Sequence, residues 1–264
     1  MQSIVLIKEV PDIRVGKVVF TEKGTLDRSK MGRMLNPDDA HAMEAALRLR
    51  EKHGGKITTL SMGPPTAEDS LRFSIEMGAD EAFLESDIAL GGSDTLATAY
   101  ALTEAIKKLG EFDFIFAGLK ALDGETGQVG PQVAENLHLP EVAYVEEILN
   151  IDVDNKLIES RTIFEGGYTI LVSKYPALLT ITPTFYEPRR PTPMNILKAK
   201  KAVIRKLTAK DCDLDLSRIG LNGSPTKVAK SGPGDATGRH CKFLGEGATL
   251  EEIIQVITSN SVQK

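Results

Sequence analysis

The sequence predicts an α/β fold built on a largely parallel sheet. Short β-branched runs alternate with amphipathic segments along residues 1–140, and Gly or Pro residues mark the changes. Strands and helices that alternate in this way form a parallel sheet with helical crossovers. The 264 residues suffice for one large α/β domain with appendages, and 41% apolar and 26% charged content is typical of a soluble globular protein.

Composition and charge exclude several classes of function. The formal net charge of -5 argues against wholesale nucleic-acid binding. No apolar run approaches ~20 residues, so we expect no membrane span. Cys212 and Cys241 lie far apart without a CxxC pattern, so we expect neither a zinc site nor a disulfide framework. We interpret them as free thiols in a reducing compartment, which predicts a cytoplasmic protein.

Each element of the first half has its own local signal. A helix begins at Asn36, because Pro37 fits the first helical position and Asp38 and Asp39 favour the positive end of a helix. It ends at the pair of glycines that starts with Gly54. We expect strands at 3–10, 57–62, 80–84 and 112–117, further helices at 67–77, 95–109 and 132–137, and a small hairpin at 17–26.

The character of the chain changes after Pro140. Four β-like runs separated by turns predict a small antiparallel β region, at residues 142–152, 156–164, 168–174 and 177–183. The proline-rich stretch 187–193 can be neither a regular helix nor an inner strand. A basic helix is expected at 195–201, and its lysines are either a solvated face or a docking patch for a charged partner.

The C-terminal part has too few large apolar residues to bury much surface by itself. Residues 210–245 are rich in Gly, Pro, Asp, Ser and Lys, and a short amphipathic helix is expected at 248–257. An arm that wraps another subunit and a disordered tail both fit this composition. We favour an α/β domain at 1–205, which includes a docking segment at 187–201, and an extended arm at 206–264.

The loop at residues 121–131 is the most informative feature for function. It joins a predicted buried strand to a predicted helix, so free backbone N–H groups lie at the positive end of that helix and suit a pyrophosphate. Gly124, Gly127 and Gly130 lack Cβ atoms and let a ligand approach the backbone. The spacing is neither that of GxGxxG nor that of the ATPase loop, and a turn that merely caps a helix is the simpler alternative.

Loops from four strands meet at one edge of such a sheet. They contain residues 10–12, 62–63, 91–95 and 123–130. Ligands on open α/β sheets bind at the carboxyl ends of the strands. The convergence of these loops therefore predicts a nucleotide pocket more strongly than any single loop does.

No residues form a convincing catalytic or metal-binding set. The four histidines stand apart from any HExxH pattern. Asp38 and Asp39 are better interpreted as first-turn acids than as a metal pair. Asp123 and Glu125 are a paired acid site, hydrogen-bond acceptors for ribose or ribityl hydroxyls, or helix caps. A nucleotide held without catalytic side chains fits a reaction that the cofactor carries.

Several motifs together resemble the β subunit of electron transfer flavoprotein. The most specific is EPR at 187–189 followed by NILKAKK at 195–201. The others are IKEVPD at 7–12, NPDDA at 36–40 with Glu44 and Ala45, MGAD at 77–80, DGETGQVGP at 123–131 and PALL at 176–179. The resemblance covers residues 1–205 and implies a Rossmann-like fold of the adenine-nucleotide-binding type. It also implies a heterodimer with an α subunit, which the C-terminal arm embraces.

The resemblance also implies a cofactor and a reaction. The family's β subunit holds AMP in ordinary members and FAD in electron-bifurcating members, and a further FAD sits mainly on the α subunit. The loop at 123–131 is similar to that of the bifurcating group, so FAD is favoured. NADH is then the electron donor, and ferredoxin and an acyl-CoA-type or other flavin dehydrogenase are the partners. A nucleotide-binding scaffold without a redox role is the alternative from another class.

Carried over position by position, the resemblance implies a set of nucleotide contacts. They are Leu6, Asn36, Pro37, Asp38, Asp39, Met62, Asp94, Thr95, Thr98, Asp123, Thr126, Gly127, Gln128, Val129 and Gly130. No catalytic side chain and no metal ligand is implied. The family's docking motif often has Leu before Pro-Asn-Ile, whereas this chain has Pro-Met-Asn-Ile at 193–196, so the identity of the dehydrogenase stays open.

Overall fold

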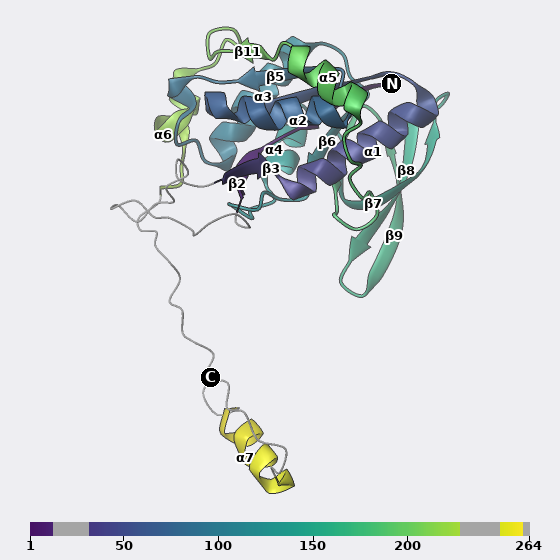
Figure 1. The fold of residues 1–264 in the computed structure, drawn as a ribbon, viewed down its shortest axis with the longest axis vertical. Helices are drawn as coiled ribbons and strands as arrows, with labels where there is room; N and C mark the ends of the chain where they lie inside the picture. The colour runs from purple at the N-terminus through teal and green to yellow at the C-terminus, as the bar shows by residue number, and fades with distance from the viewer. Residues whose placement is uncertain (13–31, 228–248, 261–264) are drawn as a thin grey trace.

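The computed structural model describes residues 1–12, 32–227 and 249–260, and Figure 1 shows how their elements are arranged. The hairpin expected at 17–26 and Cys241 lie outside these residues. The last described segment contains helix α7 (Leu250–Asn260), where a terminal helix was predicted. Within the described ranges, no helix has the length and apolar character needed to cross a lipid bilayer.

The described residues form one nine-stranded sheet and a separate two-stranded ribbon. The strands of the sheet are β1 (Gln2–Leu6), β4 (Lys56–Met62), β5 (Glu81–Glu85), β6 (Phe114–Gly118), β7 (Glu141–Asp152), β8 (Leu157–Phe164), β9 (Gly167–Lys174), β10 (Ala177–Ile181) and β11 (Arg205–Leu207). Their order is β11-β5-β4-β1-β6-β10-β7-β8-β9. Neighbours from β11 to β7 are all parallel, which confirms the predicted α/β fold. The ribbon pairs β2 (Glu9–Asp12) with β3 (Gly32–Leu35).

Helices cover both faces of the sheet (Figure 1). The helices α1 (Pro37–His53), α2 (Glu68–Met77) and α5 (Pro193–Lys201) pack on one face, and α3 (Thr95–Leu109) and α4 (Val129–Asn136) pack on the other. The shorter elements are η2 (Pro65–Ala67), η3 (Ile88–Leu90), η4 (Leu216–Arg218) and α6 (Gly220–Gly223). The predicted ends of the first helix are confirmed, because α1 is flanked by Asn36 and Gly54.

The central strands are apolar on both faces because helices bury both. In β6, Phe114 and Phe116 are fully buried in the core under α1 and α2, and Ile115 between them lies in the core under α3 and α4. Successive side chains of a strand point to opposite faces, which produces this division. A continuous apolar run is therefore what a strand of a doubly covered parallel sheet requires.

The β region after Pro140 differs from the prediction in one strand. β7, β8 and β9 pair antiparallel as expected, but β10 lies between β6 and β7 and is parallel to both. All five residues of β10 are buried. The run 177–181 is therefore a central strand of the main sheet, because its apolar side chains need cover on both faces.

The first strand ends earlier than the predicted 3–10. The chain leaves the sheet after Leu6, and the backbone N–H of Lys8 donates to the carboxylate of Asp39 at 2.7 Å instead of continuing the ladder. It then enters β2 and pairs with β3. The predicted strand is therefore two strands separated by Lys8 and by Ile7, whose N–H still donates to the carbonyl of Leu60 at 2.8 Å.

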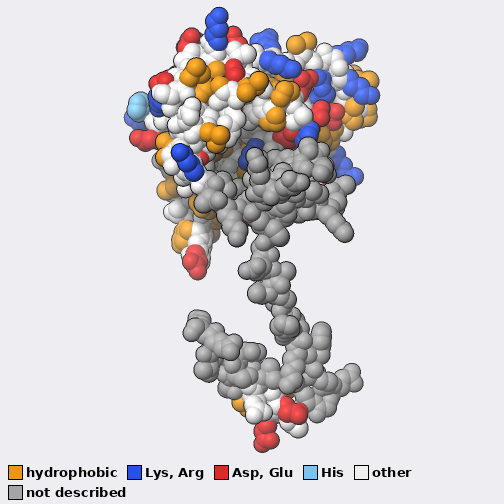
Figure 2. Space-filling model, turned by 90° about the vertical axis from the view of Figure 1, so that its left-hand side faces the viewer, with side chains coloured by type: hydrophobic (Ala, Val, Ile, Leu, Met, Phe, Trp, Pro, Cys, Tyr) orange, Lys and Arg blue, Asp and Glu red, His pale blue; other side chains and the backbone are white. Residues whose placement is uncertain are grey.

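The chain stays on the domain beyond the expected boundary between 205 and 206. β11 adds a parallel strand beside β5, and the residues that follow pack on α3. The hydroxyl of Tyr100 accepts the N–H of Asp215 at 3.1 Å, and the guanidinium of Arg218 lies 3.8 Å from the centre of the same ring. Figure 2 shows this side of the domain, where apolar side chains are interspersed with basic and acidic ones.

Glu85, at the end of β5, is a buried carboxyl group without a good partner. Its side chain is fully buried, and neither oxygen has a hydrogen bond among the described residues. Burial raises the pKa of Glu85 to about 7, and the Cys212 thiol, which approaches without a well-formed hydrogen bond, offsets this only in part. Ionisation of Glu85 therefore costs more in the folded chain than in the unfolded chain.

We expect Glu85 to make the protein less stable as the pH rises from about 4.5, the ordinary pKa of a glutamate, to about 7, with little further change above that. The variant Glu85→Gln has no charge to bury, so its stability relative to the unchanged protein should improve by roughly 2 kcal/mol between pH ~5 and ~8. Denaturant unfolding at both pH values measures this difference. Replacement of the exposed Glu135 by Gln is the control. A stability difference for Glu85→Gln that does not change with pH would contradict the prediction.

Candidate nucleotide-binding site

The strand order of the sheet reverses at β1. The chain proceeds from β1 to β4 and β5 on one side and then crosses to β6 on the other. Such a reversal separates the loops at the carboxyl ends of neighbouring strands and leaves a crevice in which α/β proteins bind ligands. Here the crevice lies between the residues that follow β1 and the loop 119–128 that follows β6.

The carboxylate of Asp39 joins the start of α1 to both of these strands. One oxygen accepts the N–H of Lys8 at 2.7 Å, and the other accepts the N–H of Gly118 at 3.2 Å. Burial raises the pKa of Asp39 to about 7, although Asn36 and the two N–H groups oppose the rise. The ends of β1 and β6 are thus held at fixed positions against the first turn of α1.

Asn36 begins α1 as predicted, but its side chain does not cap the helix. Its Nδ2 donates to the carbonyl of Lys120 at 2.9 Å, and its Oδ1 accepts the N–H of Leu122 at 3.0 Å. The carboxylate of Asp38 accepts the N–H of Lys120 at 3.2 Å. These side chains therefore hold the loop after β6. Within the described part of the chain, no three His, Cys, Asp or Glu side chains are grouped to bind a metal ion.

The loop turns into α4 and presents backbone donors there. Glu125 and Gly127 have left-handed conformations, with φ of 52° and 62°. α4 begins at Val129, earlier than the predicted 132, because Pro131 fits a first turn in which its missing N–H is not needed. Among the described residues, no acceptor is bonded to the N–H groups of Thr126, Gly127, Val129 and Gly130.

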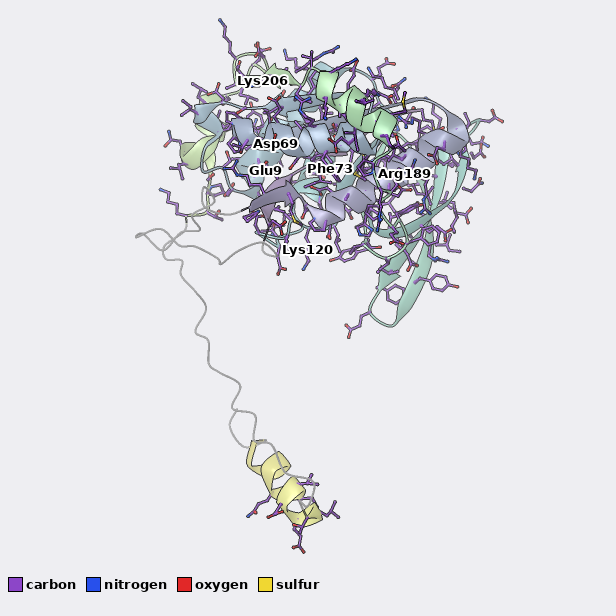
Figure 3. All side chains as sticks on the ribbon, viewed as in Figure 1. Glu9, Asp69, Phe73, Lys120, Arg189 and Lys206 are labelled. Atoms are coloured by element: carbon purple, nitrogen blue, oxygen red, sulfur yellow. The ribbon has the colours of Figure 1, made fainter. Side chains whose placement is uncertain are left out.

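Two lysines flank these donors. The Nζ of Lys8 pairs with Asp123 at 2.6 Å, and the Nζ of Lys120 lies 3.4 Å from the carboxylate of Glu125. Only 5% of the Asp123 side chain is exposed, so the carboxylate expected near a ribose is turned toward Lys8. Figure 3 shows Lys120 near the N-terminal end of α1. The loop thus combines free N–H groups with half-exposed cations.

The start of α3 meets the loop through one side-chain hydrogen bond. Thr95 Oγ1 donates to Gln128 Oε1 at 3.1 Å, and Gln128 is the residue that precedes α4. The carboxylate of Asp94 caps α3, because Oδ1 accepts the N–H groups of Leu96 and Ala97, each at 3.1 Å. The other oxygen of Asp94 is bonded to Thr226.

The other predicted contacts lie around this edge without bonding to the loop. Leu6 and Met62 end β1 and β4 and pack in or against the core under α3 and α4. Pro37 is the first residue of α1, and Thr98 lies in the first turn of α3. Among the described residues, none of these four makes a hydrogen bond to the loop 119–128.

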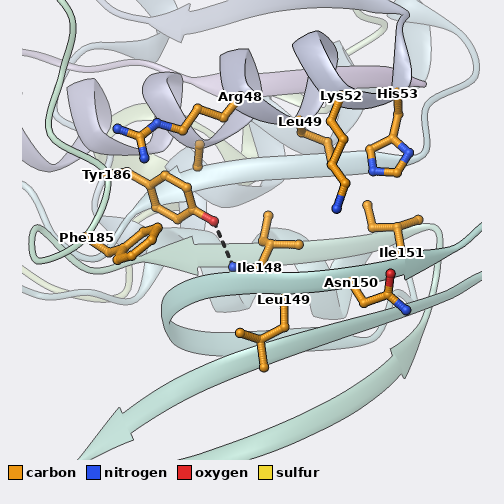
Figure 4. A pocket seen from close by; sticks show the side chains of 11 residues that line it. Arg48, Leu49, Lys52, His53, Ile148, Leu149, Asn150, Ile151, Phe185 and Tyr186 are labelled. Atoms are coloured by element: carbon orange, nitrogen blue, oxygen red, sulfur yellow. Dashed lines mark hydrogen bonds between the residues drawn. The ribbon is translucent and has the colours of Figure 1, made fainter.

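Two hollows of the described surface lie elsewhere. One, of about 150 Å³, lies between the second half of α1 and β7 and is walled by Phe185 and Tyr186 (Figure 4). There the Tyr186 hydroxyl accepts the N–H of Ile148 at 2.7 Å. The other hollow, of about 470 Å³, is bordered by α5 and β5. Neither is lined by the loop 119–128, whose backbone donors define the candidate site.

The segment 187–201 is fastened to α1 by charge. Arg189 Nε donates to Glu44 at 2.7 Å, and another of its nitrogens pairs with Glu51 at 2.5 Å. Only 4% of the Glu44 side chain is exposed. These hydrogen bonds hold the pKa of Glu44 below its usual range although burial opposes the change. Figure 3 shows Arg189 beside α1.

The helix α5 of this segment is held by the carbonyl of Ala199 and by the side chain of Lys198, and it leaves Met194 and Leu197 outside. Arg72 donates to the carbonyl of Ala199, and Lys198 donates to the carbonyl of Ala79 at 3.1 Å. Met194 and Leu197 are 75% and 55% exposed. α5 therefore presents exposed apolar side chains beside basic ones on the surface of the domain.

Three residues that shape the site were not among the predicted contacts, although Lys8 belongs to the motif IKEVPD. Lys8 and Lys120 form the ion pairs described above, and Gly118 lets α1 approach the end of β6. A Cβ atom on Gly118 would lie 2.6 Å from the carbonyl carbon of Asp38 and would also strike the Asp39 carboxylate. Gly118 belongs to no glycine-rich pattern, so only the packing of α1 explains it.

The fold and the candidate site define an α/β protein with backbone donors at a helix N-terminus, beside the reversal of strand order. The family model of the electron transfer flavoprotein domain matches residues 23–212. The electron transfer flavoprotein subunit beta of Thermoanaerobacterium thermosaccharolyticum is 47% identical over 229 residues, 86% of each chain. The chain therefore belongs to the electron transfer flavoprotein family, as a β-type subunit that works with an α subunit.

Two further relatives are named as subunits of CoA reductases. The caffeyl-CoA reductase-Etf complex subunit CarD of Acetobacterium woodii is 39% identical over 265 residues, 100% of this chain and 99% of the relative. The acryloyl-CoA reductase electron transfer subunit gamma of Anaerotignum propionicum is 42% identical over 238 residues, 88% of each chain. The family that the motifs resemble is thus confirmed.

The close approach of α1 makes Gly118 and Gly124 respond differently to the same change. Gly118→Ala should lower the free energy of unfolding by about 1–3 kcal/mol, because its Cβ would push α1 away from β6. Gly124→Ala is the matched control, since a Cβ there would have no atom within 4 Å. Denaturant unfolding of both variants measures the effect. Equal stability of the two variants would contradict the packing argument.

Proposed function

We propose that this chain is the β subunit of an electron-bifurcating electron transfer flavoprotein and that it holds FAD at residues 126–130. In this proposal the complex oxidises NADH, and electrons pass to ferredoxin and, through the FAD of the α subunit, to an acyl-CoA-type or other flavin dehydrogenase. The observation that carries the proposal is the set of four N–H groups without acceptors among the described residues, in a chain of this family.

The residues of the loop fit a pyrophosphate. Four N–H groups at the positive end of α4 form a donor set for anions. Gly127 has a φ of 62° and no Cβ, so its backbone is open to a ligand. Lys8 and Lys120 lie beside the loop, each paired with one of its carboxylates, Asp123 and Glu125 respectively. Bound FAD supplies the hydride and single-electron chemistry, while this chain binds, orients and shields it.

FAD is favoured over AMP by the loop and by the relatives. The motif DGETGQVGP at 123–131 is similar to that of the bifurcating group. The names of two relatives place them with CoA reductases, which supports an acyl-CoA-type dehydrogenase as the partner here. AMP as a structural ligand of an ordinary electron carrier is the alternative.

Two surfaces are proposed for the protein partners. The exposed Met194 and Leu197 of α5, together with its lysines, suit a dehydrogenase surface that is apolar at its centre and acidic around it. The arm at 206–264, of which 228–248 lie outside the described residues, is proposed to embrace the α subunit. The contact with ferredoxin and the cytoplasmic location stay predictions.

The identity of the nucleotide tests the proposal directly. We expect the heterodimer with the α subunit, once purified and denatured, to release two equivalents of FAD per heterodimer. Separation and quantification of the released nucleotides measures this. One FAD and one AMP would make the protein an ordinary electron carrier, and complete absence of flavin would overturn the redox function.

The variant Gly127→Asp tests the site itself. An aspartate there brings bulk and negative charge to the N–H groups and strains a left-handed backbone, so the nucleotide of this chain should be lost. The control is Gly166→Asp, which adds the same charge and the same kind of strain (φ 89°) at the β8–β9 turn. The measurement is the nucleotide content of each heterodimer. Unchanged content in Gly127→Asp would defeat the site assignment.

A further inference from the structure

Within the arm, residues 219–226 are packed tightly against the start of α3. We call residues 219–226 the arm root. The N–H of Gly220 donates to Ser93 Oγ at 2.9 Å, and the buried Ser224 Oγ donates to the carbonyl of Gly220 at 2.7 Å. Gly220 has a φ of 60°, and a Cβ there would strike the carbonyl oxygen of Ala89. The arm root therefore binds the domain in one specific position, against the residues that precede α3.

Asp94 supplies the main polar contacts between this seat and the arm root. Its Oδ2 accepts both the N–H of Thr226 at 3.0 Å and the hydroxyl of Thr226 at 2.7 Å. Its backbone N–H donates to Ser224 Oγ at 2.8 Å. Oδ1 remains engaged with the first N–H groups of α3. One carboxylate therefore fixes the start of α3 and the arm root together.

Thr95, the residue after Asp94, connects the start of α3 to the candidate nucleotide site. Thr95 Oγ1 donates to Gln128 Oε1, and Gln128 occupies the position before α4 without capping it. Without the hydrogen bond from Thr95, Gln128 Oε1 would be free to turn toward the first N–H groups of α4, as capping side chains do. It would then compete with a phosphate for those donors.

We propose that Asp94 and Thr95 are positioning residues that couple the attachment of the arm root to nucleotide binding at α4. This inference rests on the proposed function of the loop. With the arm root bound, α3 is fixed and Thr95 keeps Gln128 away from the donors. Because binding linkage is reciprocal, the nucleotide then tightens the arm root by the factor by which the arm root tightens the nucleotide.

Substitutions at the two ends of this connection test it. The protein is the heterodimer, depleted of the nucleotide of this chain and titrated with FAD. Thr226→Val removes the hydroxyl that Asp94 binds, and Thr95→Val removes the bond to Gln128. Each should weaken FAD binding by about tenfold, and the double variant should be no weaker than the worse single variant. Thr208→Val is the control, since that hydroxyl bonds Asp211 and not α3.

Hydrogen exchange of residues 219–227 provides a readout that a loss of packing alone would not give. FAD should slow exchange there in the unchanged protein and in Thr208→Val, but not in Thr95→Val. Normal FAD affinity in Thr226→Val, or additive losses in the double variant, would overturn the coupling and leave the proposed function intact. If the unchanged heterodimer binds neither FAD nor AMP at this chain, both the proposed function and the coupling fall.

Discussion

The buried carboxylate of Asp39 is the constraint on which the candidate site depends. It accepts N–H groups from the end of β6 and from the residue pair that follows β1, which are the two strands at the reversal of strand order. An acceptor removed from water must have its donors, so the positions of these ends are fixed to within a hydrogen bond. Gly118 follows from the same constraint, because no side chain fits between β6 and the start of α1.

The helix α1 links the loop after β6 to the segment 187–201. Its first turn holds the loop after β6 through Asn36 and Asp38. Its middle and last turns hold Arg189 through Glu44 and Glu51. Glu44 is buried and Arg189 is its main partner, so the pair specifies a position even where its net contribution to stability is small. One rigid helix therefore sets the distance between the proposed FAD site and α5.

The parts of this picture that the sequence predicts are those with local signals. The alternation of apolar runs and helices gives the parallel sheet, and the glycines of 121–131 give the loop. β10 is assigned wrongly because an apolar run of five residues does not tell which distant strands flank it. Asn36 starts its helix as the local rule says, but its side chain bonds a loop 84 and 86 residues away, where the N–H of Leu122 occupies the Oδ1 that a cap would use. Lys8 and Gly118 escape detection because their partners are likewise distant.

In the proposed site, the backbone donors at α4 bind a phosphate, which AMP and FAD share, so these donors contribute affinity and do not by themselves distinguish the two nucleotides. Selection between them falls to the side chains around the rest of the ligand, and the start of α3 lies next to the loop through Thr95 and Gln128. That same helix end is where Asp94 binds the arm root. The start of α3 therefore contacts both the loop of the proposed nucleotide site and the arm root.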